Sequence, residues 1–499
     1  MKLKTIIISI SCTILFSQTS TQLGGFASFN HISRLSNNSV INIPYRMFNL
    51  NINHQHENFS ILSTVALEYQ LRNDAYFLTD TNPQEFFIDL REFYAAYYGP
   101  FYEIRMGKQI HSWGSADENS PLDNAGAYDY YYIFMLGTER KMATLSVTAD
   151  FFFDNLKLNF VFSPLHTTNR LPLGNDDFPI TLPIYPEQDQ IFEIRDLPLE
   201  YGANATFSSS FGDISLSYFN GYDRIFNLTG VNVYGHGPDL SFPHLDILFG
   251  YRKTQVFGIG GVLLHELAIL RGDFGFFSTR DMNNTINQES TFNPSWYDSL
   301  HFTYPLNEQA NYFQTTIQLE TELPFGITFI GQFFKYDTLS YAADTLPVSQ
   351  QISIPNLNID PEDMTPANFF TPGMGAPLAI LSKNIGLIIL EKTFINEQAK
   401  LTSTTILDFG PDKAIGKLFG SLTEIKFEYS IEENLIGAVS VTKVSGDDSH
   451  PDGEQYQFNK MEDLLKSYAE KALESLRKVK DSDSKHNLEE LVSFTDFKA

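Results

Sequence analysis

Apolar and polar residues alternate with a period of two through segment after segment of this chain. Residues 61–72, 313–320 and 423–431 show the pattern. The last is the clearest, with Thr423, Ile425, Phe427, Tyr429 and Ile431 opposing Glu424, Lys426, Glu428 and Ser430. Successive side chains of a β-strand point to opposite faces, whereas a helix would scatter these charges around its circumference. The pattern therefore predicts strands with one apolar and one polar face.

The connections between these segments are alternately short and long. Short turns are expected at residues 154–155, 211–213, 324–326 and 432–434, and long connections at 115–143, 167–197, 279–310 and 338–375. A soluble sandwich rarely carries several loops of that length, whereas an outer-membrane barrel alternates short periplasmic turns with long external loops. We therefore predict an all-β fold. It is a closed transmembrane antiparallel β-barrel over residues 23–445, with about 14–18 strands.

Aromatic residues make up 14% of the chain and cluster near the ends of predicted strands, as at 94–98, 101–102 and 151–153. In a barrel such clusters form girdles at the two membrane interfaces. In a soluble protein they would form the core, and that alternative stays open. No run of 18 or more apolar residues follows the N-terminus, which argues against a helical membrane protein.

The N-terminus has the composition of a signal peptide. Lys2 and Lys4 precede an apolar stretch at 5–16, and small residues suitable for cleavage follow. We assign residues 1–21 to a signal peptide, 22–459 to the barrel and 460–499 to a helical tail; a first buried strand is the alternative for the N-terminus. The only cysteine, Cys12, lies in the apolar stretch. A mature chain without cysteine excludes a disulfide scaffold and a thiol nucleophile.

The chain is strongly acidic, with a net charge of −26. Removing Lys2 and Lys4 with the signal peptide leaves 32 basic and 60 acidic residues, a net charge of −28. Nucleic acid is therefore excluded as a partner, because its phosphates are negative as well. The acidic residues either keep loops soluble or create a pore field that favours cations.

The last forty residues depart from the strand pattern. Apolar residues recur at helical spacing among charged ones over 461–480, namely Leu464, Leu465, Tyr468, Ala472, Leu473 and Leu476. The spacing predicts a C-terminal amphipathic helix. Three alternatives for closing the barrel stay open. They are a short final strand near 488–497, the helix in its place, and a change of reading frame near Met461.

The segment 88–123 carries the candidate pore residues. We place Asp89, Arg91, Glu103, Arg105, Gln109 and His111 along the pore, because they occupy the polar faces of two successive predicted strands. Acids facing bases across a lumen give a transverse field that orients polar solutes. Cross-strand pairing that only stabilises the wall explains the same charges. The loop 113–123 is expected to fold inward as a constriction, with Trp113, Asp117 and Asp123 as its residues.

The same region carries a set of motifs in a fixed order. They are LREFY at 90–94, RMGKQ at 105–109 and WGSADENSPLD at 113–123, with YRKT at 251–254 and LRGDF at 270–274 further on. This order resembles a poorly characterised family of bacterial outer-membrane porin-like β-barrels, over about residues 60–280. The loop departs from the family pattern at Ser120, which stands between Asn119 and Pro121. The resemblance implies a porin-type barrel.

Several groups of polar residues match no known motif of a metal-binding or catalytic site. The acidic pairs 176–177 and 447–448 match no calcium-loop spacing, and His265-Glu266 lacks the second histidine of a zinc-protease motif. We find no nucleophile elbow, phosphate loop or dinucleotide fingerprint. We therefore expect a protein that is not an enzyme and has no metal or cofactor.

The expected function is that of a Gram-negative outer-membrane porin, giving passive diffusion of small polar solutes with a preference for cations. The alternatives are an outer-membrane transporter of hydrophobic compounds and, third, an outer-membrane barrel enzyme. The expected partners are outer-membrane lipid, small solutes and the barrel-insertion machinery, and a homo-oligomer is left open. The protein is expected to cross the periplasm before it inserts in the outer membrane.

Overall fold

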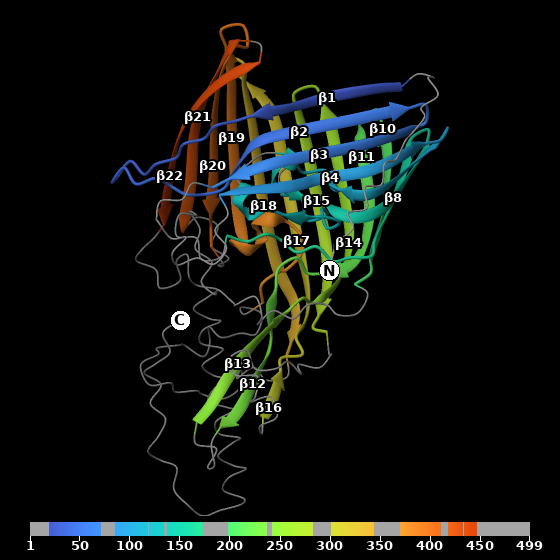
Figure 1. Ribbon diagram of the computed structural model, residues 1–499, viewed down its shortest axis with the longest axis vertical. Coiled ribbons are helices and arrows are strands. Elements are labelled where there is room, and N and C mark those ends of the chain that lie inside the picture. The colour runs from blue at the N-terminus through green and yellow to red at the C-terminus, as the bar shows by residue number, and fades with distance from the viewer. Residues whose placement is uncertain are drawn as a thin grey trace, which may run out of the picture.

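The computed structural model describes residues 19–70, 85–117, 119–133, 137–172, 198–236, 242–282, 301–343, 370–410, 418–432 and 434–446. Most of these residues belong to one large sheet of long tilted strands, seen in Figure 1. Most of the predicted signal peptide and the whole predicted helix at 461–480 lie outside the described residues. Strand β1 already includes residues 19–21, the last three of the predicted signal peptide.

The large sheet has 17 strands. They are β1 (Thr19–Ala27), β2 (Tyr45–His56), β3 (Phe59–Tyr69), β4 (Phe86–Tyr98), β5 (Tyr102–Gln109), β8 (Thr144–Phe153), β9 (Leu156–Ser163), β10 (Glu200–Ser209), β11 (Gly212–Tyr222), β14 (Lys253–His265), β15 (Ala268–Arg280), β17 (Gln309–Leu323), β18 (Ile327–Ala342), β19 (Asn384–Phe394), β20 (Ala399–Asp408), β21 (Gly420–Glu432) and β22 (Leu435–Gly446). Each strand pairs antiparallel with the next of these in the sequence. The predicted all-β antiparallel fold and strand number are confirmed.

Smaller elements interrupt the long connections. A three-stranded sheet of β12 (Asn227–His236), β13 (Phe242–Gly250) and β16 (His301–Pro305) extends beyond the end of the large sheet (Figure 1). The connection between β5 and β8 contains β6 (Ala127–Tyr128), β7 (Lys141–Met142) and the 3-10 helices η2 (Tyr130–Tyr132) and η3 (Gly137–Arg140). Helix η6 (Pro377–Ile380) precedes β19. None of the described helices is long and apolar enough to cross a membrane.

Short and long connections occupy opposite ends of the sheet. The turn at 154–155 joins β8 to β9 and that at 324–326 joins β17 to β18, both as predicted. Asp154 (φ 38°), Phe325 (φ 71°) and Gly326 (φ 65°) take left-handed backbone conformations, which tight turns require. At the other end the connections range from 11 residues (409–419) to 41 residues (343–383).

The predicted closure of the barrel is not seen in the part of the chain that is described. No pairing joins β1 to β22 among the described residues, and both strands are exposed over most of their length. The strand number rules out one way of closing the sheet. With 17 strands and antiparallel neighbours throughout, the first and last strands run in the same direction, so an antiparallel pair between them is geometrically excluded.

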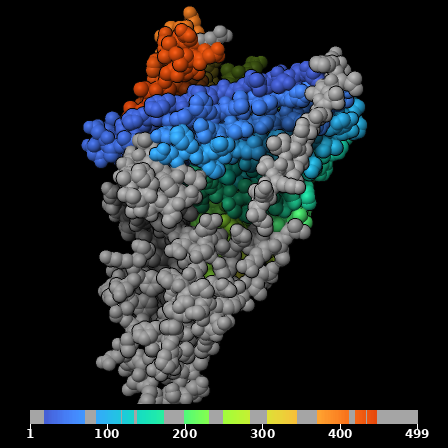
Figure 2. All heavy atoms as spheres, in the orientation of Figure 1, coloured from blue at the N-terminus to red at the C-terminus, as the bar shows by residue number. Residues whose placement is uncertain are grey.

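The two faces of the sheet are inverted relative to those of a soluble protein. On β17, Gln314, Thr316 and Gln318 are 0% exposed, whereas Ile317 is 53% and Leu319 is 40% exposed. The same outward placement recurs around the sheet, for example at Met106, Phe160, Ile214, Leu216, Phe257, Ile259, Ile425 and Phe427. In Figure 2 the N-terminal strands form one continuous outer surface. A soluble sandwich would bury these side chains, so that alternative is excluded.

Candidate functional site

The connection between β5 and β8, residues 110–143, folds back into the interior of the barrel. Most of its described side chains are buried, including Trp113, Leu122, Tyr128 and Tyr130, at 7%, 1%, 4% and 4% exposure. Its hydrogen-bond partners come from strands on several sides of the barrel, among them β9, β15 and β17. A long connection made of polar and aromatic residues can do this because the inner faces of the strands offer polar partners.

The tip of this segment is bound to β15 and β17. The carboxylate of Asp273 accepts hydrogen bonds from the backbone N–H of Ser115, at 2.8 and 3.0 Å, and of Ala116, at 2.8 Å. Gln318 Nε2 donates to Asp117 Oδ2 at 2.6 Å, and Gln318 Oε1 accepts from Asp117 N at 3.1 Å. Five strands separate β5 from β15 along the sheet. The tip therefore bridges distant parts of the wall.

Asp123 closes the loop at its base. Its Oδ1 accepts from the backbone N–H of Trp113 at 3.1 Å, and its Oδ2 accepts from the Tyr128 hydroxyl at 2.6 Å. Lys141 Nζ lies 2.5 Å from the same Oδ2. The Trp113 indole donates to Asn159 Oδ1 on β9 at 2.9 Å. Trp113 and Asp123 thus fix the two ends of the loop that the sequence predicts as a constriction.

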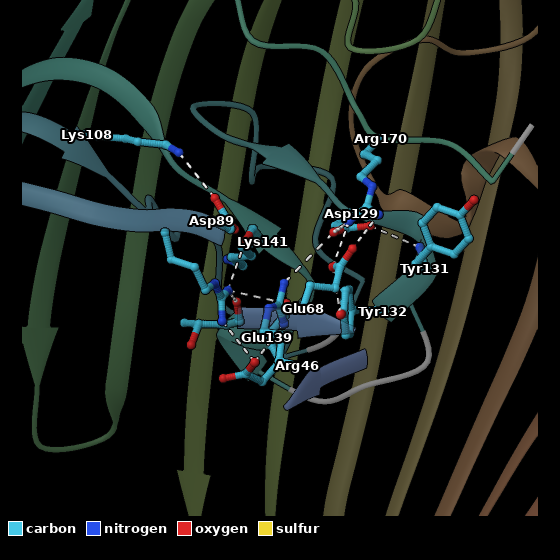
Figure 3. A network of polar contacts seen from close by, with 12 residues as sticks. Arg46, Glu68, Asp89, Lys108, Asp129, Tyr131, Tyr132, Glu139, Lys141 and Arg170 are labelled. Atoms are coloured by element: carbon cyan, nitrogen blue, oxygen red, sulfur yellow. Dashed lines mark hydrogen bonds and ion pairs between the residues drawn. The ribbon is translucent and has the colours of Figure 1, made fainter. Parts of the chain in front are cut away.

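The second half of the inner segment is bound to β2, β3 and β4 through ion pairs, drawn in Figure 3. Glu139 Oε2 lies 2.8 Å from Arg46 Nη1 and 2.9 Å from Arg91 Nη1. Arg91 Nη2 also donates to the carbonyls of Thr138 and Lys141, at 2.8 and 3.2 Å. The two guanidiniums are 5% and 4% exposed and Glu139 is 35% exposed. One carboxylate thus bridges two nearly buried arginines, and Arg46 Nη2 also lies 3.9 Å from Asp129 Oδ2.

A second pair of acids extends this network. Arg170 Nη2 donates to Glu68 Oε1 at 2.7 Å, and its Nη1 donates to Asp129 Oδ2 at 3.0 Å. The Tyr132 hydroxyl donates to Glu68 Oε2 at 2.9 Å (Figure 3). Arg46 stacks over the Tyr132 ring at 3.8 Å from its centroid. The network therefore pairs three arginines, Arg46, Arg91 and Arg170, with three acids, Glu68, Asp129 and Glu139.

Residues 370–382 form another inner segment, which meets the first. The Met374 carbonyl accepts from Gln314 Nε2 at 2.9 Å, and the Pro377 carbonyl accepts from the Tyr130 hydroxyl at 2.7 Å. Asn119 Oδ1 accepts from the Leu378 N–H at 3.0 Å. A cavity of about 10 Å³ lies between the two segments, bordered by Asp123, Asn124, Tyr128, Asn169, Arg224 and Met374 among others. It has room for about one water molecule.

The predicted pore residues lie on inner or adjoining positions, but most contact protein groups. Arg105 Nη2 donates to Asp150 Oδ2 at 2.9 Å, and Arg105 Nε lies 3.4 Å from Glu103 Oε1. Arg105 and Glu103 are 24% and 22% exposed. Asp89 Oδ1 lies 3.6 Å from Lys108 Nζ. These contacts are those expected of cross-strand pairs that stabilise the wall of the barrel. The roles of these residues in a pore stay predictions.

Gln109 and His111 are buried. Gln109 is 0% exposed and donates to the Ser146 carbonyl at 2.9 Å. His111 is 6% exposed, with its Nε2 at 2.9 Å from Ser146 Oγ. Burial, and then the positive charge of Arg105, lowers the pKa of His111 to about 4. The imidazole is therefore neutral at physiological pH and adds no charge to the lumen.

Reversing the charge at Arg105 tests the predicted pore lining. Arg105→Glu would place a third carboxylate beside Glu103 and Asp150, and like charges at such distances repel. We expect a change in single-channel conductance or in ion selectivity, measured in planar lipid bilayers. If both stay at the wild-type value, Arg105 does not line the conducting path. Arg34→Glu, far along the chain between β1 and β2, serves as the charge-matched control.

Sequence reasoning missed several residues of the site. Glu68 lies on the polar face of the predicted strand 61–72, and Arg46 lies in no segment that the sequence indicated; nothing local marks either residue as a partner of an inner segment. Asp273 belongs to the LRGDF motif at 270–274, whose family resemblance implies no role for this residue. This motif is the one feature of the sequence that could have indicated Asp273 as a residue of the site. Within the described ranges, no three His, Cys, Asp or Glu side chains are grouped so that they could hold a metal ion.

No model of a known protein family and no curated protein sequence matches the chain. Among solved structures it is similar to a BenF-like porin from Pseudomonas fluorescens Pf-5, at 9% identity and a TM-score of 0.41 over 81% of this chain and 86% of that one. It is also similar to OccK8 (OprE) from Pseudomonas aeruginosa, at 9% identity and 0.41 over 86% and 93%. It is similar as well to the outer membrane protein opdK from Pseudomonas aeruginosa. The identity is 9% and the TM-score 0.41, over 82% of this chain and 92% of that one. At these TM-scores the fold rests on the chain's own strand pairing.

Proposed function

We propose that this protein is a porin of the bacterial outer membrane, which lets small polar solutes diffuse through its lumen without catalysis. The observation that carries the proposal is the inversion of the sheet. Ile317 and Leu319 face outward, while Gln314, Thr316 and Gln318 between and beside them face inward. An apolar outer surface is stable against lipid, and a polar inner surface is stable against water or polar side chains. This arrangement suits a barrel that spans a membrane.

The inner segments suit a narrowed pore. The loop 113–123 crosses from the end of β5 to Asp273 and Gln318 on β15 and β17. Residues 370–382 contact this loop at Asn119 and the rest of the inner segment 110–143 at Tyr130. Loops that fold into a barrel reduce its free cross-section and place fixed charges beside the path. We infer that these segments set the size and charge of the solutes that pass.

The charge of the interior favours cations. Asp223, Asp281 and Glu308 share one guanidinium, that of Arg252, and Asp273 is held by backbone N–H groups and serine hydroxyls. Above about pH 7, where Glu308 and Asp281 are ionised as well, we therefore expect a lumen with an excess of negative charge, which attracts cations and repels anions.

Purified protein in a planar bilayer should conduct, and its reversal potential in a KCl gradient should have the sign of a potassium preference. Heat-unfolded protein from the same preparation is the control for contaminating pores. A folded protein that gives no conductance at any applied voltage would refute the porin function. Conductance with a chloride preference would refute the charge argument alone.

A further inference from the structure

Three carboxylates surround one guanidinium where the ends of β11, β14, β15 and β17 meet. Arg252 Nε donates to Asp223 Oδ2 at 2.7 Å, and Arg252 Nη1 lies 3.1 Å from Glu308 Oε2. Asp281 Oδ2 accepts from the Glu308 backbone N–H at 2.7 Å, and Asp281 Oδ1 accepts from Asn227 Nδ2 at 3.0 Å. The four charged residues, at 0% to 6% exposure, are almost completely buried. We call Asp223, Arg252, Asp281 and Glu308 the carboxylate cluster.

The carboxylate cluster has more acids than it can neutralise. If all three acids ionise, the single arginine leaves two negative charges in a buried site, which is strongly unfavourable. Burial is the largest cause that raises the pKa of both Glu308 and Asp281, and the neighbouring carboxylates add to it while Arg252 opposes it. The phenol of Tyr312 also faces this cluster, whereas the guanidinium of Arg224 pairs with Glu200 at 2.9 Å. The cluster therefore retains protons at a pH where exposed carboxyls have lost them.

The same groups hold the inner segment 370–376 in place. Arg252 Nη2 donates to the Thr371 carbonyl at 2.6 Å, and its guanidinium lies 4.7 Å from the centroid of the Phe370 ring. The Gly373 carbonyl accepts from the backbone N–H of Arg224 at 2.7 Å. Gly373 lies so close to Asp223 that a Cβ there would meet Asp223 Oδ2 at 2.4 Å. Arg252 thus contacts both the carboxylates of Asp223 and Glu308 and the inner segment at Thr371.

We propose that the carboxylate cluster is a proton-controlled latch, which keeps residues 370–376 inside the lumen when it is protonated and releases them when it is not. The inference rests on the proposed porin function and adds a regulation of the same site. Ionised Glu308 and Asp281 attract Arg252 away from the Thr371 carbonyl and gain hydration if the segment moves. The pore is therefore more occluded in acid and more open at neutral and alkaline pH.

Proton linkage gives the direction in which pH shifts the equilibrium between the inserted and the released arrangement. In the released arrangement the two carboxyls are hydrated and have ordinary pKa values of about 4. In the inserted arrangement burial raises these pKa values, to about 7 for Glu308 and about 6 for Asp281. The inserted arrangement binds protons more tightly, so its advantage is full below about pH 4 and is lost as the pH rises to about 7.

The accessibility of a cysteine at position 374 tests the latch directly. Met374 is 4% exposed in the inserted arrangement. Met374→Cys, in a chain whose only other cysteine is removed by Cys12→Ser, should react with a membrane-impermeant thiol reagent only when the segment leaves its place. Rates at pH 5.5 and pH 8 are divided by those of Asn155→Cys, an exposed turn position, to correct for thiol ionisation. We expect the corrected rate to be at least about tenfold higher at pH 8, since one pKa unit is a tenfold change in equilibrium.

Glu308→Gln in the same background should abolish this difference, because the amide keeps the shape of the side chain and cannot ionise. Asp281→Asn should reduce the difference without abolishing it. The matched control is Glu320→Gln, a lumenal carboxylate that lies 3.6 Å from Arg271 and outside the carboxylate cluster; it should keep the full pH effect.

Three outcomes would overturn the latch. They are a corrected rate that does not change with pH, a Glu308→Gln protein that responds to pH like the wild type, and a Glu320→Gln protein that has lost the response. Conductance recorded on the same samples separates the two claims. A pH-dependent labelling rate without conductance at any pH would support the latch as a conformational device and refute the porin function.

Discussion

Replacing Glu139 with glutamine should lower the free energy of unfolding by about 3 kcal/mol. Its carboxylate lies 2.8 Å from Arg46 and 2.9 Å from Arg91, whose side chains are 5% and 4% exposed. The amide cannot neutralise them, and two buried cations then lie close together with insufficient compensation. We take the lower end of the usual range for breaking a buried ion pair because Glu139 itself is 35% exposed and water reaches it.

The measurement is urea unfolding of the protein refolded in phospholipid, followed by tryptophan fluorescence. The matched control is Glu428→Gln, which removes a glutamate that pairs with Lys426 at 2.8 Å with both side chains partly exposed, at 27% and 40%. That pair is worth at most about 1 kcal/mol. Equal losses for the two variants would show that the network of Figure 3 does not anchor the inner segment.

Replacing Asp273 with alanine should release the tip of the loop 113–123 and raise the conductance. The carboxylate accepts the N–H groups of Ser115 and Ala116 at 2.8 to 3.0 Å. Each hydrogen bond to a charged group contributes about 1.5–3 kcal/mol, so the loss of this acceptor raises the population of detached loop tips at least about tenfold. We expect a larger mean single-channel conductance, with more frequent transitions between conductance levels.

Asp213→Ala is the control for the charge that Asp273→Ala removes. Asp213 is half-buried on β11, and its strand partner is Val262 on β14. It should lower the preference for cations slightly and leave the conductance levels unchanged. Two variants with the same conductance traces would contradict the anchoring role of Asp273.

The wall of the barrel could be predicted from the sequence because its signal is local. A residue two positions along a strand returns to the same face, so the alternation at 423–431 reports the orientation of β21 without any other part of the chain. The turns at 154–155 and 324–326 were equally local, since a tight turn and its two strands are contiguous. The strand number and the antiparallel order followed from the same pattern.

The candidate site was predictable only in part. The sequence indicated Trp113, Asp117 and Asp123 as the residues of an inward loop, and the structure places that loop inside the barrel. The partners of the loop were not predictable, because Asp273 and Gln318 follow Ser115 and Asp117 by 158 and 201 positions. The period-two alternation reports only on neighbouring residues of one strand, so it does not show which side chains pair over such separations.

The sequence by itself determined which residues face lipid and which face the lumen, because that choice is repeated at every second position of each strand. Only the tertiary structure decided which charges meet across the lumen and in which direction the first and last strands of the sheet run. Both depend on the sheet as a whole. Arg46, Arg91 and Glu139 come together only after the wall curves around the inner segment. The parallel direction of β1 and β22 appears only when all 17 strands are placed in order.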